Sequence, residues 1–485
     1  MTDCVIVAPG PTAQIYGPLA GEFAAIEPSI WSRIIGAYLR KRGFSVHLVD
    51  MGAQGYAPEV LRMICNDHRP KIVAIVAYGQ QPSASTQTMP AAVACARTLG
   101  GFHAVIIGGH PSALPLETAQ TGEFTYVCDG EGARTLEGLL RSDPLDEIPG
   151  LVYRRARRTW SNDRAAPLNA AAGELEGDCW DLVDPSAYRA HSWQCLDDLS
   201  QRSPYASIYT SFNCPFACSF CCISAPFHDN RLKTRDPIEV VDEIEMLYRD
   251  YGVKTLKIAD EMFILGKRHY QTICQELIRR DLGRHLNIWC YGRVDSVKPS
   301  ELALLRAAGI KWIALGIESG SKFVRDGAEK ELRSDDITGV VRAIQAADIN
   351  VIGNFIVGLP DDTHETMQQT LDLALDLKCE FMNLYSAMAY PGSKLYTDAV
   401  AQGRPLPEHW SGYSQHSYDC TPLGNDVLSR TEVLAFRDAA FQRYFNDPGV
   451  LAAMKNRFGQ AAIDHVAAMM AVKLPRKLLG DAAPE

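Results

Sequence analysis

The chain has 485 residues, of which 47% are hydrophobic and 22% are charged, a composition typical of globular proteins that excludes a disordered or disulfide-dense chain. At roughly 150 residues per domain, this length predicts about two to four packed units. The formal charge of −10 argues against a protein that mainly neutralises nucleic-acid phosphates.

The first residues, MTDCVIVAPG, have no basic region before a strand-length apolar run, so we expect no secretory signal. No run of about 18 apolar residues occurs without a charge or a helix breaker, so we expect no membrane-spanning helix. These features predict a cytoplasmic protein. In that compartment the 14 cysteines are expected to be small buried hydrophobes or metal ligands rather than disulfides.

Residues 1–142 alternate short apolar strands with amphipathic helices. The helix that follows Pro28 has Ile30, Ile34 and Leu39 on one face and ends at Gly43. We expect strands at Cys4–Ala8, Phe44–Asp50, Lys71–Gly79, His103–Gly109 and Phe124–Cys128, with further helices at Pro58–Asn66 and Thr88–Leu99. Because the strands are almost continuously apolar, helices are expected on both faces of their sheet. The pattern predicts a doubly wound, Rossmann-like α/β domain.

Residues 143–203 lose this alternation and are predicted to be a linker. They contain several prolines, scattered tryptophans and a basic run at Arg154–Arg158. A basic run of this kind can form a nucleic-acid patch, but the acidic net charge favours an exposed hairpin or loop.

Residues 204–400 return to the alternation of strands and helices. Six strands are expected, at Tyr205–Phe212, Thr255–Asp260, Ile288–Gly292, Trp312–Glu318, Val351–Gly358 and Phe381–Ala389. Six β/α units predict a partial TIM-type barrel whose active site lies at the carboxyl ends of the strands. Residues 401–485 are predicted to be helical. Their amphipathic tail, Ala461–Leu479, is expected to pack on the barrel, with contact to a membrane surface as the alternative.

Three cysteines follow the first predicted barrel strand at a regular spacing. Cys214, Cys218 and Cys221 lie within NCPFACSFC. Iron–sulfur clusters are held by cysteine thiolates, and a cubane cluster normally takes four, so three ligands leave one iron open for a substrate. The alternative is a zinc site completed by Cys222. It is less favoured because the adjacent Cys221 and Cys222 are poorly placed to bind one tetrahedral ion.

The segment CPFACSFC resembles the CxxxCxxC loop of the radical S-adenosylmethionine (SAM) enzymes, which lies directly after the first barrel strand. The resemblance implies a [4Fe–4S] cluster whose open iron is chelated by the amino and carboxylate groups of SAM. Electron transfer then cleaves SAM to a 5′-deoxyadenosyl radical. The resemblance also implies that Phe220 lies near the cluster and the adenine, although an aromatic residue here can serve packing alone.

Later strand ends match the SAM site of this family in the same order along the chain. The implied SAM contacts are Asp260 and Glu261 for the amino group, Arg293 for a carboxylate, Glu318 and Ser319 for the ribose hydroxyls and Gly358, within VGLP, for the adenine. An ionised carboxylate suits an amine donor, and a guanidinium group binds a carboxylate through two hydrogen bonds.

The position of the first domain before the barrel resembles the cobalamin-binding radical SAM subfamily, as do the segments GGHPSALP and CDGEGARTL. The implied cobalamin contacts are Ser83, Ser85, Gly108, Gly109, Gly130, Glu131 and Gly132. Proteins that bind cobalt through a histidine carry DxHxxG, whereas this chain has DMGAQG with Gly52 at the histidine position, so we expect no histidine ligand. The alternative is a domain that has lost cobalamin and serves as a scaffold.

The resemblance implies an enzyme that methylates an unactivated carbon of a small-molecule or lipid-like substrate. It also implies an external one-electron reductant of the flavodoxin or ferredoxin type, and no nucleic-acid partner. A cobalamin-dependent radical oxidation or cyclisation is the first alternative, and a redox sensor without turnover is the second. Five residues are candidates for an apolar substrate pocket, namely Tyr385, Met388, Trp410, Tyr413 and Tyr418.

Overall fold

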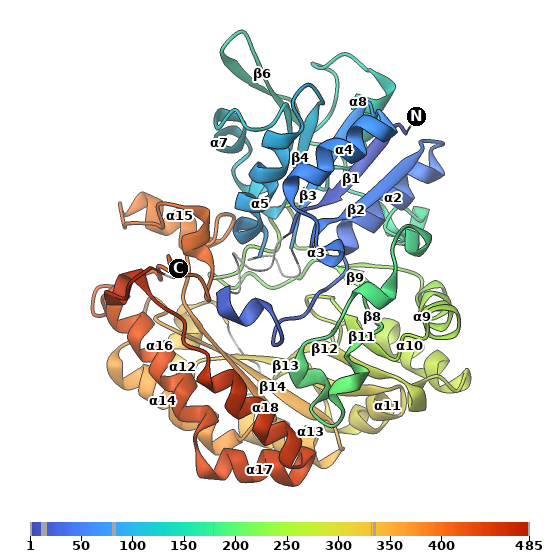
Figure 1. The fold of residues 1–485 in the computed structure, drawn as a ribbon. Coiled ribbons are helices and arrows are strands. Elements are labelled where there is room, and N and C mark those ends of the chain that lie inside the picture. Colours follow the sequence, from blue (N-terminus) through green and yellow to red (C-terminus); the bar gives the residue numbers. More distant parts are fainter. Residues whose placement is uncertain are drawn as a thin grey trace.

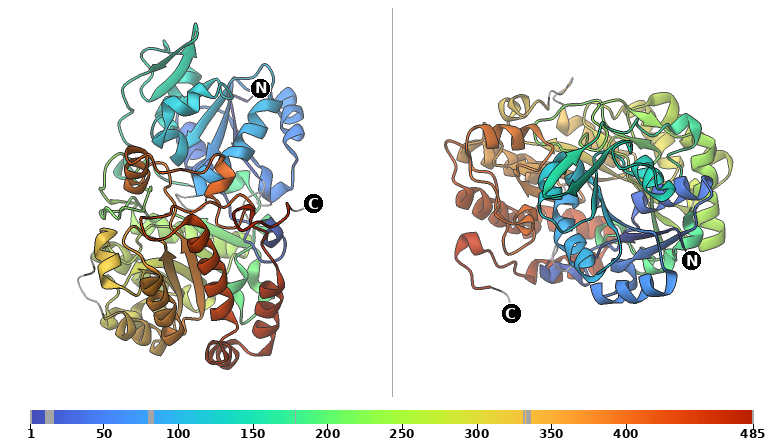
Figure 2. Two further views of the ribbon diagram at one scale, coloured as in Figure 1. Left: turned by 90° about the vertical axis from the view of Figure 1, so that its left-hand side faces the viewer. Right: turned by 90° about the horizontal axis from the view of Figure 1, so that it is seen from above.

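Two largely parallel sheets, one in each half of the chain, organise the molecule (Figure 1). The computed structural model describes residues 2–10, 17–79, 84–177, 179–330, 332 and 336–483. The first domain is stacked on one end of the barrel, and the C-terminal helices lie along the side of the barrel (Figure 2). This arrangement brings the carboxyl ends of both sheets to the same interface.

The first sheet has the strand order β2-β1-β3-β4-β5-β6-β7, and β1 to β5 are parallel. Its strands are β1 (Cys4–Ala8), β2 (Val46–Asp50), β3 (Ile72–Ala77), β4 (Ala104–Gly108), β5 (Tyr126–Cys128), β6 (Leu151–Arg155) and β7 (Arg158–Ser161). Its helices are α2 (Ile30–Lys41), α3 (Met51–Gln54), α4 (Pro58–His68), α5 (Ala84–Thr98), α6 (Gly109–Ala113), α7 (Pro115–Gln120) and α8 (Ala133–Arg141). Helices α2 and α8 share one apolar core and α4 and α5 share another, so the doubly wound prediction is confirmed.

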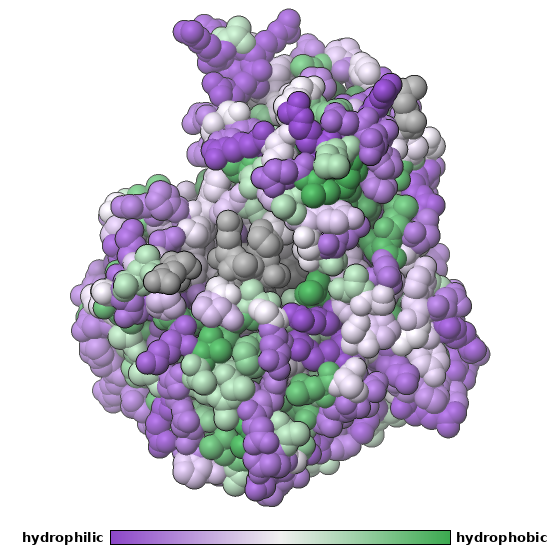
Figure 3. Space-filling model, viewed as in Figure 1, coloured by the Kyte–Doolittle hydropathy of each residue, from purple (hydrophilic) through white to green (hydrophobic). Residues whose placement is uncertain are grey.

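The predicted linker contains more structure than its sequence pattern indicates. Strands β6 and β7 form an antiparallel hairpin that extends the first sheet, and Arg154, Arg155 and Arg158 are exposed on it. The hairpin gives the hydrophilic projection at the top of Figure 3. Short 3₁₀ helices follow at η2 (Ala170–Ala172), η3 (Cys179–Leu182), η4 (Pro185–Ala187), η5 (Ser192–Cys195) and η6 (Leu199–Arg202). The expectation of an exposed hairpin for the basic run is confirmed.

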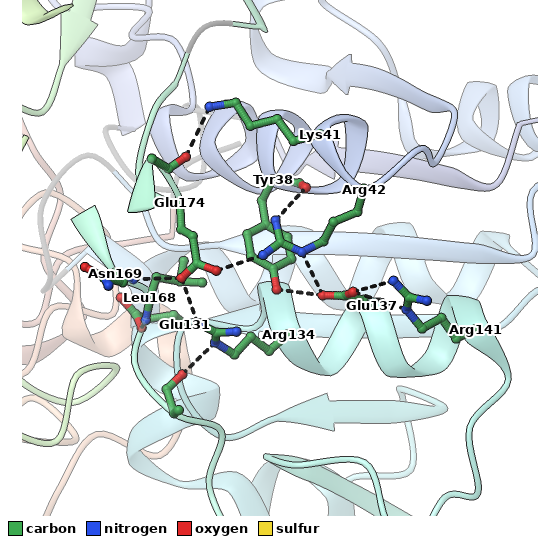
Figure 4. A network of polar contacts seen from close by, with 12 residues as sticks. Tyr38, Lys41, Arg42, Glu131, Arg134, Glu137, Arg141, Leu168, Asn169 and Glu174 are labelled. Atoms are coloured by element: carbon green, nitrogen blue, oxygen red, sulfur yellow. Dashed lines mark hydrogen bonds and ion pairs between the residues drawn. The ribbon is translucent and has the colours of Figure 1, made fainter. Parts of the chain in front are cut away.

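A polar network attaches this segment to the first domain (Figure 4). The Glu174 carboxylate accepts hydrogen bonds from Arg42 of α2 and Arg134 of α8, each at 2.7 Å. It also accepts one from the backbone N–H of Asn169 at 2.9 Å. One carboxylate therefore joins two helices that cover the same face of the sheet to the middle of the linker.

The second sheet is a half-barrel of six parallel strands in the order β15-β14-β13-β12-β11-β8. Its strands are β8 (Tyr205–Ile208), β11 (Thr255–Ile258), β12 (Asn287–Arg293), β13 (Ile310–Glu318), β14 (Asn350–Val357) and β15 (Phe381–Ser386). Its helices are α9 (Pro237–Tyr251), α10 (Lys267–Arg279), α11 (Leu302–Ala307), α12 (Lys322–Gly327), α13 (Ile337–Ala346), α14 (His364–Leu377) and α15 (Lys394–Ala401). Strands β9 (Ser211–Phe212) and β10 (Lys233–Thr234) form a short ribbon at the interface between the domains, and 3₁₀ helices lie at η7 (Gly283–His285) and η8 (Pro299–Glu301). The predicted partial barrel is confirmed.

Segments from outside the barrel close its interior. From the linker, Trp193 meets Trp289 and Trp312 at 5.2 and 5.4 Å between ring centroids, and Gln194 donates a hydrogen bond to the carbonyl of Asn287 at 3.0 Å. Asn287 begins β12, so the linker fills the amino-terminal end of the barrel. The segment that begins with η1 (Gly17–Ala20) also enters the barrel, where Glu27 lies 3.0 Å from Lys257 of β11.

The C-terminal region is helical, but its tail is not one continuous helix. It contains α16 (Arg430–Phe445), α17 (Pro448–Phe458) and α18 (Gln460–Ala471), with 3₁₀ helices at η9 (Trp410–Tyr413) and η10 (Lys477–Leu479). Beyond α18, Arg476 is 1% exposed and its Nε lies 2.9 Å from the carboxylate of Asp438. The tail thus packs on the barrel, as expected. Over the described part of the chain, no helix is both long and apolar enough to cross a membrane.

Candidate functional site

The carboxyl ends of the two sheets border one narrow cavity between the domains. The first domain lines it with Trp31, Tyr78, Gly79 and Gly109, and the barrel lines it with Tyr209, Cys222, Ile223, Pro226, Phe227 and Glu261. The Trp31 and Tyr78 rings are stacked with centroids 4.3 Å apart. Residues that follow β3, β4, β8 and β11 therefore meet at one place.

The cysteine loop begins directly after β9, and hydrogen bonds to its backbone fix its conformation at several points. Asn213 adopts a left-handed conformation (φ 69°), and its side-chain oxygen accepts a hydrogen bond from the Cys214 N–H at 2.8 Å. Asparagine tolerates this conformation better than most residues. Further along, Ser219 donates to the carbonyl of Ala328 at 3.1 Å and accepts from the N–H of Leu395 at 2.9 Å. The loop is thus anchored to residues near α12 and α15.

Cys214, Cys218 and Cys221 are partly buried and form no disulfides. Burial raises the pKa of the Cys214 thiol to about 11, and the charge of Cys218 adds to the effect, so these two thiols lie within electrostatic reach of each other. Among the described residues, no three metal-binding side chains converge on a single point. A cubane cluster normally takes four thiolates, so three cysteines in one short loop leave one iron open.

Two buried cations surround Cys218. The Nζ of Lys330 lies 2.7 Å from Oε1 of Glu318, and each of these side chains is 8% exposed. The guanidinium group of Arg293 lies 3.8 Å above the ring of Phe216 in the cysteine loop. Burial raises the pKa of Cys218 and the charge of Glu318 adds to this rise, while the charges of Lys330 and Arg293 oppose it. Both cations favour a thiolate, the form that binds a metal.

Glu261 presents a carboxyl oxygen without a partner to the cavity. Its Oε1 accepts a hydrogen bond from the Tyr209 hydroxyl at 3.3 Å, while Oε2 is buried without a hydrogen-bond partner in the described part of the chain. Burial raises the pKa of Glu261 to about 8, so the side chain carries a proton at neutral pH. An unused buried acceptor next to a cavity is the kind of group that a bound ligand completes.

Asp260, the neighbour of Glu261, uses its oxygens within the protein. Its carboxylate accepts hydrogen bonds from the N–H of Thr210 at 2.6 Å, from the hydroxyl of Thr210 at 2.5 Å and from the hydroxyl of Ser211 at 2.7 Å. These residues lie between β8 and the cysteine loop. Asp260 therefore positions the segment that leads into the loop, and Glu261 is the better candidate for contact with a ligand.

Three further residues of the predicted SAM site make contacts within the protein. The hydroxyl of Ser319 lies 3.1 Å from that of Thr370. Phe220 packs against two apolar clusters near α12 and α15. Gly358 has a positive φ of 82°, and a Cβ at this position would approach Val433 of α16 to 2.5 Å. These residues support the walls of the site, and nothing in their surroundings identifies a ligand.

The predicted cobalamin contacts divide into supporting residues and residues at the interface. Ser83 lies outside the described residues. Ser85 accepts a hydrogen bond from the N–H of His110 at 2.8 Å, and an added Cβ at Gly108 or Gly132 would collide with the sheet. Glu131 accepts from the N–H of Leu168 at 2.6 Å and lies 3.2 Å from Lys233 of the barrel.

Gly109 and Gly130 lie at the edge of the first sheet that faces the barrel. Gly109 lines the cavity. At Gly130 an added Cβ would meet only the carbonyl oxygen of Pro226, at 3.7 Å. Glycine at these positions lets a ligand approach the backbone closely, as a bound corrin ring would require.

The five residues predicted to line an apolar pocket are spread over β15, η9 and the segments that follow them. Trp410 packs against the first domain, Met388 lies in a small cluster with Leu434, and the Tyr418 hydroxyl donates to the carbonyl of Asp481 at 3.0 Å. Tyr413 is buried, with its ring centroid 6.0 Å from that of Tyr390. Only Tyr385 lies on a barrel strand.

Comparison with protein-family models gives two matches. Residues 208–374 match the radical SAM superfamily, and residues 17–140 match the B12 binding domain. The first match begins at the end of β8 and includes the cysteine loop, and the second covers most of the first domain.

Curated relatives and solved structures agree with these matches. An anaerobic magnesium-protoporphyrin IX monomethyl ester cyclase of Cereibacter sphaeroides is 26% identical over 433 residues, which cover 86% of this chain and 67% of the relative. A cytidylyl-2-hydroxyethylphosphonate methyltransferase of Streptomyces wedmorensis is 22% identical over 85% of each chain. The radical SAM methyltransferase TsrM of Kitasatospora setae, with tryptophan substrate and a SAM analogue bound, has a TM-score of 0.67 at 16% identity, covering 99% of this chain and 97% of its own. The cobalamin-dependent radical SAM enzyme OxsB has a TM-score of 0.58 at 18% identity, covering 83% of this chain and 56% of its own.

Proposed function

Because the chain is a radical SAM enzyme with a B12-binding domain, we propose that it transfers a methyl group to a carbon atom of a small-molecule substrate held at the barrel mouth. When bound, the [4Fe–4S] cluster supplies the electron that cleaves SAM, and cobalamin supplies the methyl group. The observation that carries the proposal is the cavity shared by the carboxyl ends of both sheets. It gives a ligand of the first domain direct access to a ligand of the barrel.

In this proposal the cysteine loop holds the cluster and its surroundings bind SAM. Cys214, Cys218 and Cys221 are the ligands. Lys330, paired with Glu318, and Arg293, paired with Asp295, each stabilise negative charge at Cys218 and would orient a carboxylate of SAM. The Nζ of Lys330 lies 2.7 Å from Oε1 of Glu318, and this ion pair fixes the position of the ammonium group in the site.

Glu261 and Tyr209 line the cavity from the barrel side. At neutral pH Glu261 is protonated and both donates and accepts hydrogen bonds. A bound ammonium group would lower the pKa of Glu261, because a nearby positive charge favours the ionised carboxylate. We propose that Glu261 receives the amino group of SAM and that the Tyr209 hydroxyl, at 3.3 Å, keeps the carboxyl group oriented.

A second candidate function is a radical oxidation or ring closure without methyl transfer. The observation that favours it is the 26% identity over 433 residues to an anaerobic magnesium-protoporphyrin ester cyclase. The two functions share the cluster, SAM and cobalamin and differ in the fate of the methyl group.

The test is anaerobic reconstitution followed by turnover with SAM that carries a ¹³C-labelled methyl group. We expect about four irons and one cobalt per chain, 5′-deoxyadenosine release and ¹³C in the product. An oxidised product without the label would support the second candidate instead. A chain with a full cluster that releases no 5′-deoxyadenosine would contradict both and leave a redox sensor.

A further inference from the structure

Four neighbouring strands carry one row of residues across the barrel. Backbone pairing places Arg293 beside Gly316, Gly316 beside Asn354, and Asn354 beside Asn383. Paired positions of parallel strands lie on the same face of a sheet. The alternate residue Phe355 is fully buried in the core beneath the outer helices, so this row faces the barrel interior.

Side chains become partly exposed from this row toward the carboxyl ends of the strands. Below it, Ile352 is 1% exposed, and Trp193 of the linker packs against Trp312 of β13. At and above it, Asn354, Ile356, Asn383 and Tyr385 are only partly buried. Strands of a parallel sheet are normally buried on both faces. Partial exposure of these side chains on two adjacent inner strands therefore marks the open part of the barrel mouth.

The two asparagines form a pair with unused hydrogen-bonding groups. The side-chain N–H of Asn383 donates to the side-chain oxygen of Asn354 at 2.9 Å. In the described part of the chain neither amide makes another hydrogen bond. The pair therefore retains a free carbonyl oxygen and a free amino group side by side. If both side-chain amides were turned by 180°, the pair would still offer one free carbonyl oxygen and one free amino group.

The charges nearest to this pair neutralise each other. A Cβ at Gly316 would lie 2.8 Å from Nζ of Lys330 and 2.6 Å from Oε1 of Glu318, so this ion pair covers the glycine between Arg293 and Asn354. The asparagines thus present dipoles and no net charge.

We propose that Asn354 and Asn383 bind the substrate through an amide or lactam group, which presents a carbonyl oxygen and an N–H on one edge. This inference rests on the proposed function, because it assigns the barrel mouth to the substrate. A hydrocarbon or lipid would leave both amides without partners, which is costly in a partly buried site. The structure thus favours a polar, uncharged substrate group over the lipid-like one.

The experiment compares δ-valerolactam with δ-valerolactone, six-membered rings that differ only in N–H against O. Binding to the reconstituted full-length protein is measured by ligand-observed NMR, without reductant and with SAM at saturation. We expect the lactam to bind about tenfold more tightly than the lactone, because the lactone leaves one acceptor unpaired. Asn383→Leu removes the acceptor of the lactam N–H and should abolish this preference, whereas Asn354→Leu removes the donor to the carbonyl and should weaken the binding of both rings. Asn66→Leu, on the exposed face of α4, should keep the preference.

Equal binding of the two rings, or binding of neither, would overturn the inference. So would lactam binding that is present in a parallel sample without SAM and absent with SAM at saturation, since the pair would then be a SAM contact. If Asn383→Leu fails to load iron, Asn383→Ala replaces it, because it removes the same acceptor without adding apolar bulk. Wild-type 5′-deoxyadenosine release is measured separately. Its loss with normal lactam binding contradicts only the proposed function, and normal release without lactam preference contradicts only this inference.

Discussion

Replacing Glu243 with glutamine should destabilise both domains together. Its side chain is 5% exposed on α9, and its carboxylate lies 2.8 Å from Arg235 and 3.4 Å from Arg33 and accepts the Trp180 indole N–H at 2.6 Å. Arg33 belongs to α2 of the first domain and is 1% exposed, and it also donates to the carbonyl of Ser207 in β8 at 2.7 Å. Glutamine keeps the shape but leaves two buried guanidinium groups without an anion.

The expected loss is about 3–5 kcal/mol, the usual cost of removing one partner from a buried ion pair. At about 2.1 cal/mol/K per residue over 485 residues, the unfolding entropy is about 1 kcal/mol/K, so Tm should fall by about 3–5 °C. Glu245→Gln is the matched control on the same helix. Glu245 pairs with Arg249 at 2.6 Å near the surface, and surface pairs contribute at most about 1 kcal/mol.

The assay is differential scanning calorimetry of the full chain. A single transition that shifts as a whole in Glu243→Gln would show that the network joins the two domains. Adding Arg33→Met removes one unpaired guanidinium group and should recover part of the loss. The reasoning is refuted if Glu243→Gln lowers Tm no more than Glu245→Gln does, or if only one of two separate transitions moves.

Four further variants test the site. Cys218→Ala should abolish iron retention and SAM cleavage but spare corrinoid binding, measured by metal analysis and ultraviolet–visible spectra; SAM cleavage at the wild-type rate would refute the ligand assignment. Lys330→Met leaves a buried carboxylate without its cation and should weaken SAM binding about tenfold or more in equilibrium dialysis. Between about pH 4.5 and 8 the folded chain holds a proton on Glu261 that the unfolded chain has lost. The free energy of unfolding should therefore fall by up to about 1.4 kcal/mol for each pH unit of increase in this range. Glu261→Gln should flatten this slope in denaturant titrations. Gly358→Ala should cost about 1–3 kcal/mol because its Cβ would approach Val433 to 2.5 Å, and Val433→Ala should restore part of that loss.

The strands and the cysteine loop could be predicted from the sequence because their signals are local. The first strand is observed at Cys4–Ala8, as predicted, and the fifth barrel strand at Asn350–Val357 is shifted by one residue. Each signal comes from a short apolar run bounded by turn residues. Cys214, Cys218 and Cys221 are likewise separated by only a few positions.

Contacts between distant segments could not be predicted in this way. Lys330 lies 12 positions after Glu318, and no motif marks it as a partner of Cys218. Asn354 and Asn383 become neighbours only through the register of β14 and β15. The tail helix ends at Ala471 rather than near Leu479, because tertiary contacts of the following residues override the amphipathic pattern.

The ion pair between Glu27 and Lys257 joins positions that are 230 residues apart. At about 5–20 residues per second, a ribosome needs roughly 10–50 s to make the second partner after the first. For that period the N-terminal segment has a carboxylate without its ammonium partner, and the chain is exposed to chaperones and proteases in a half-finished state. Slower translation before β11 would lengthen this interval and lower the yield of intact protein.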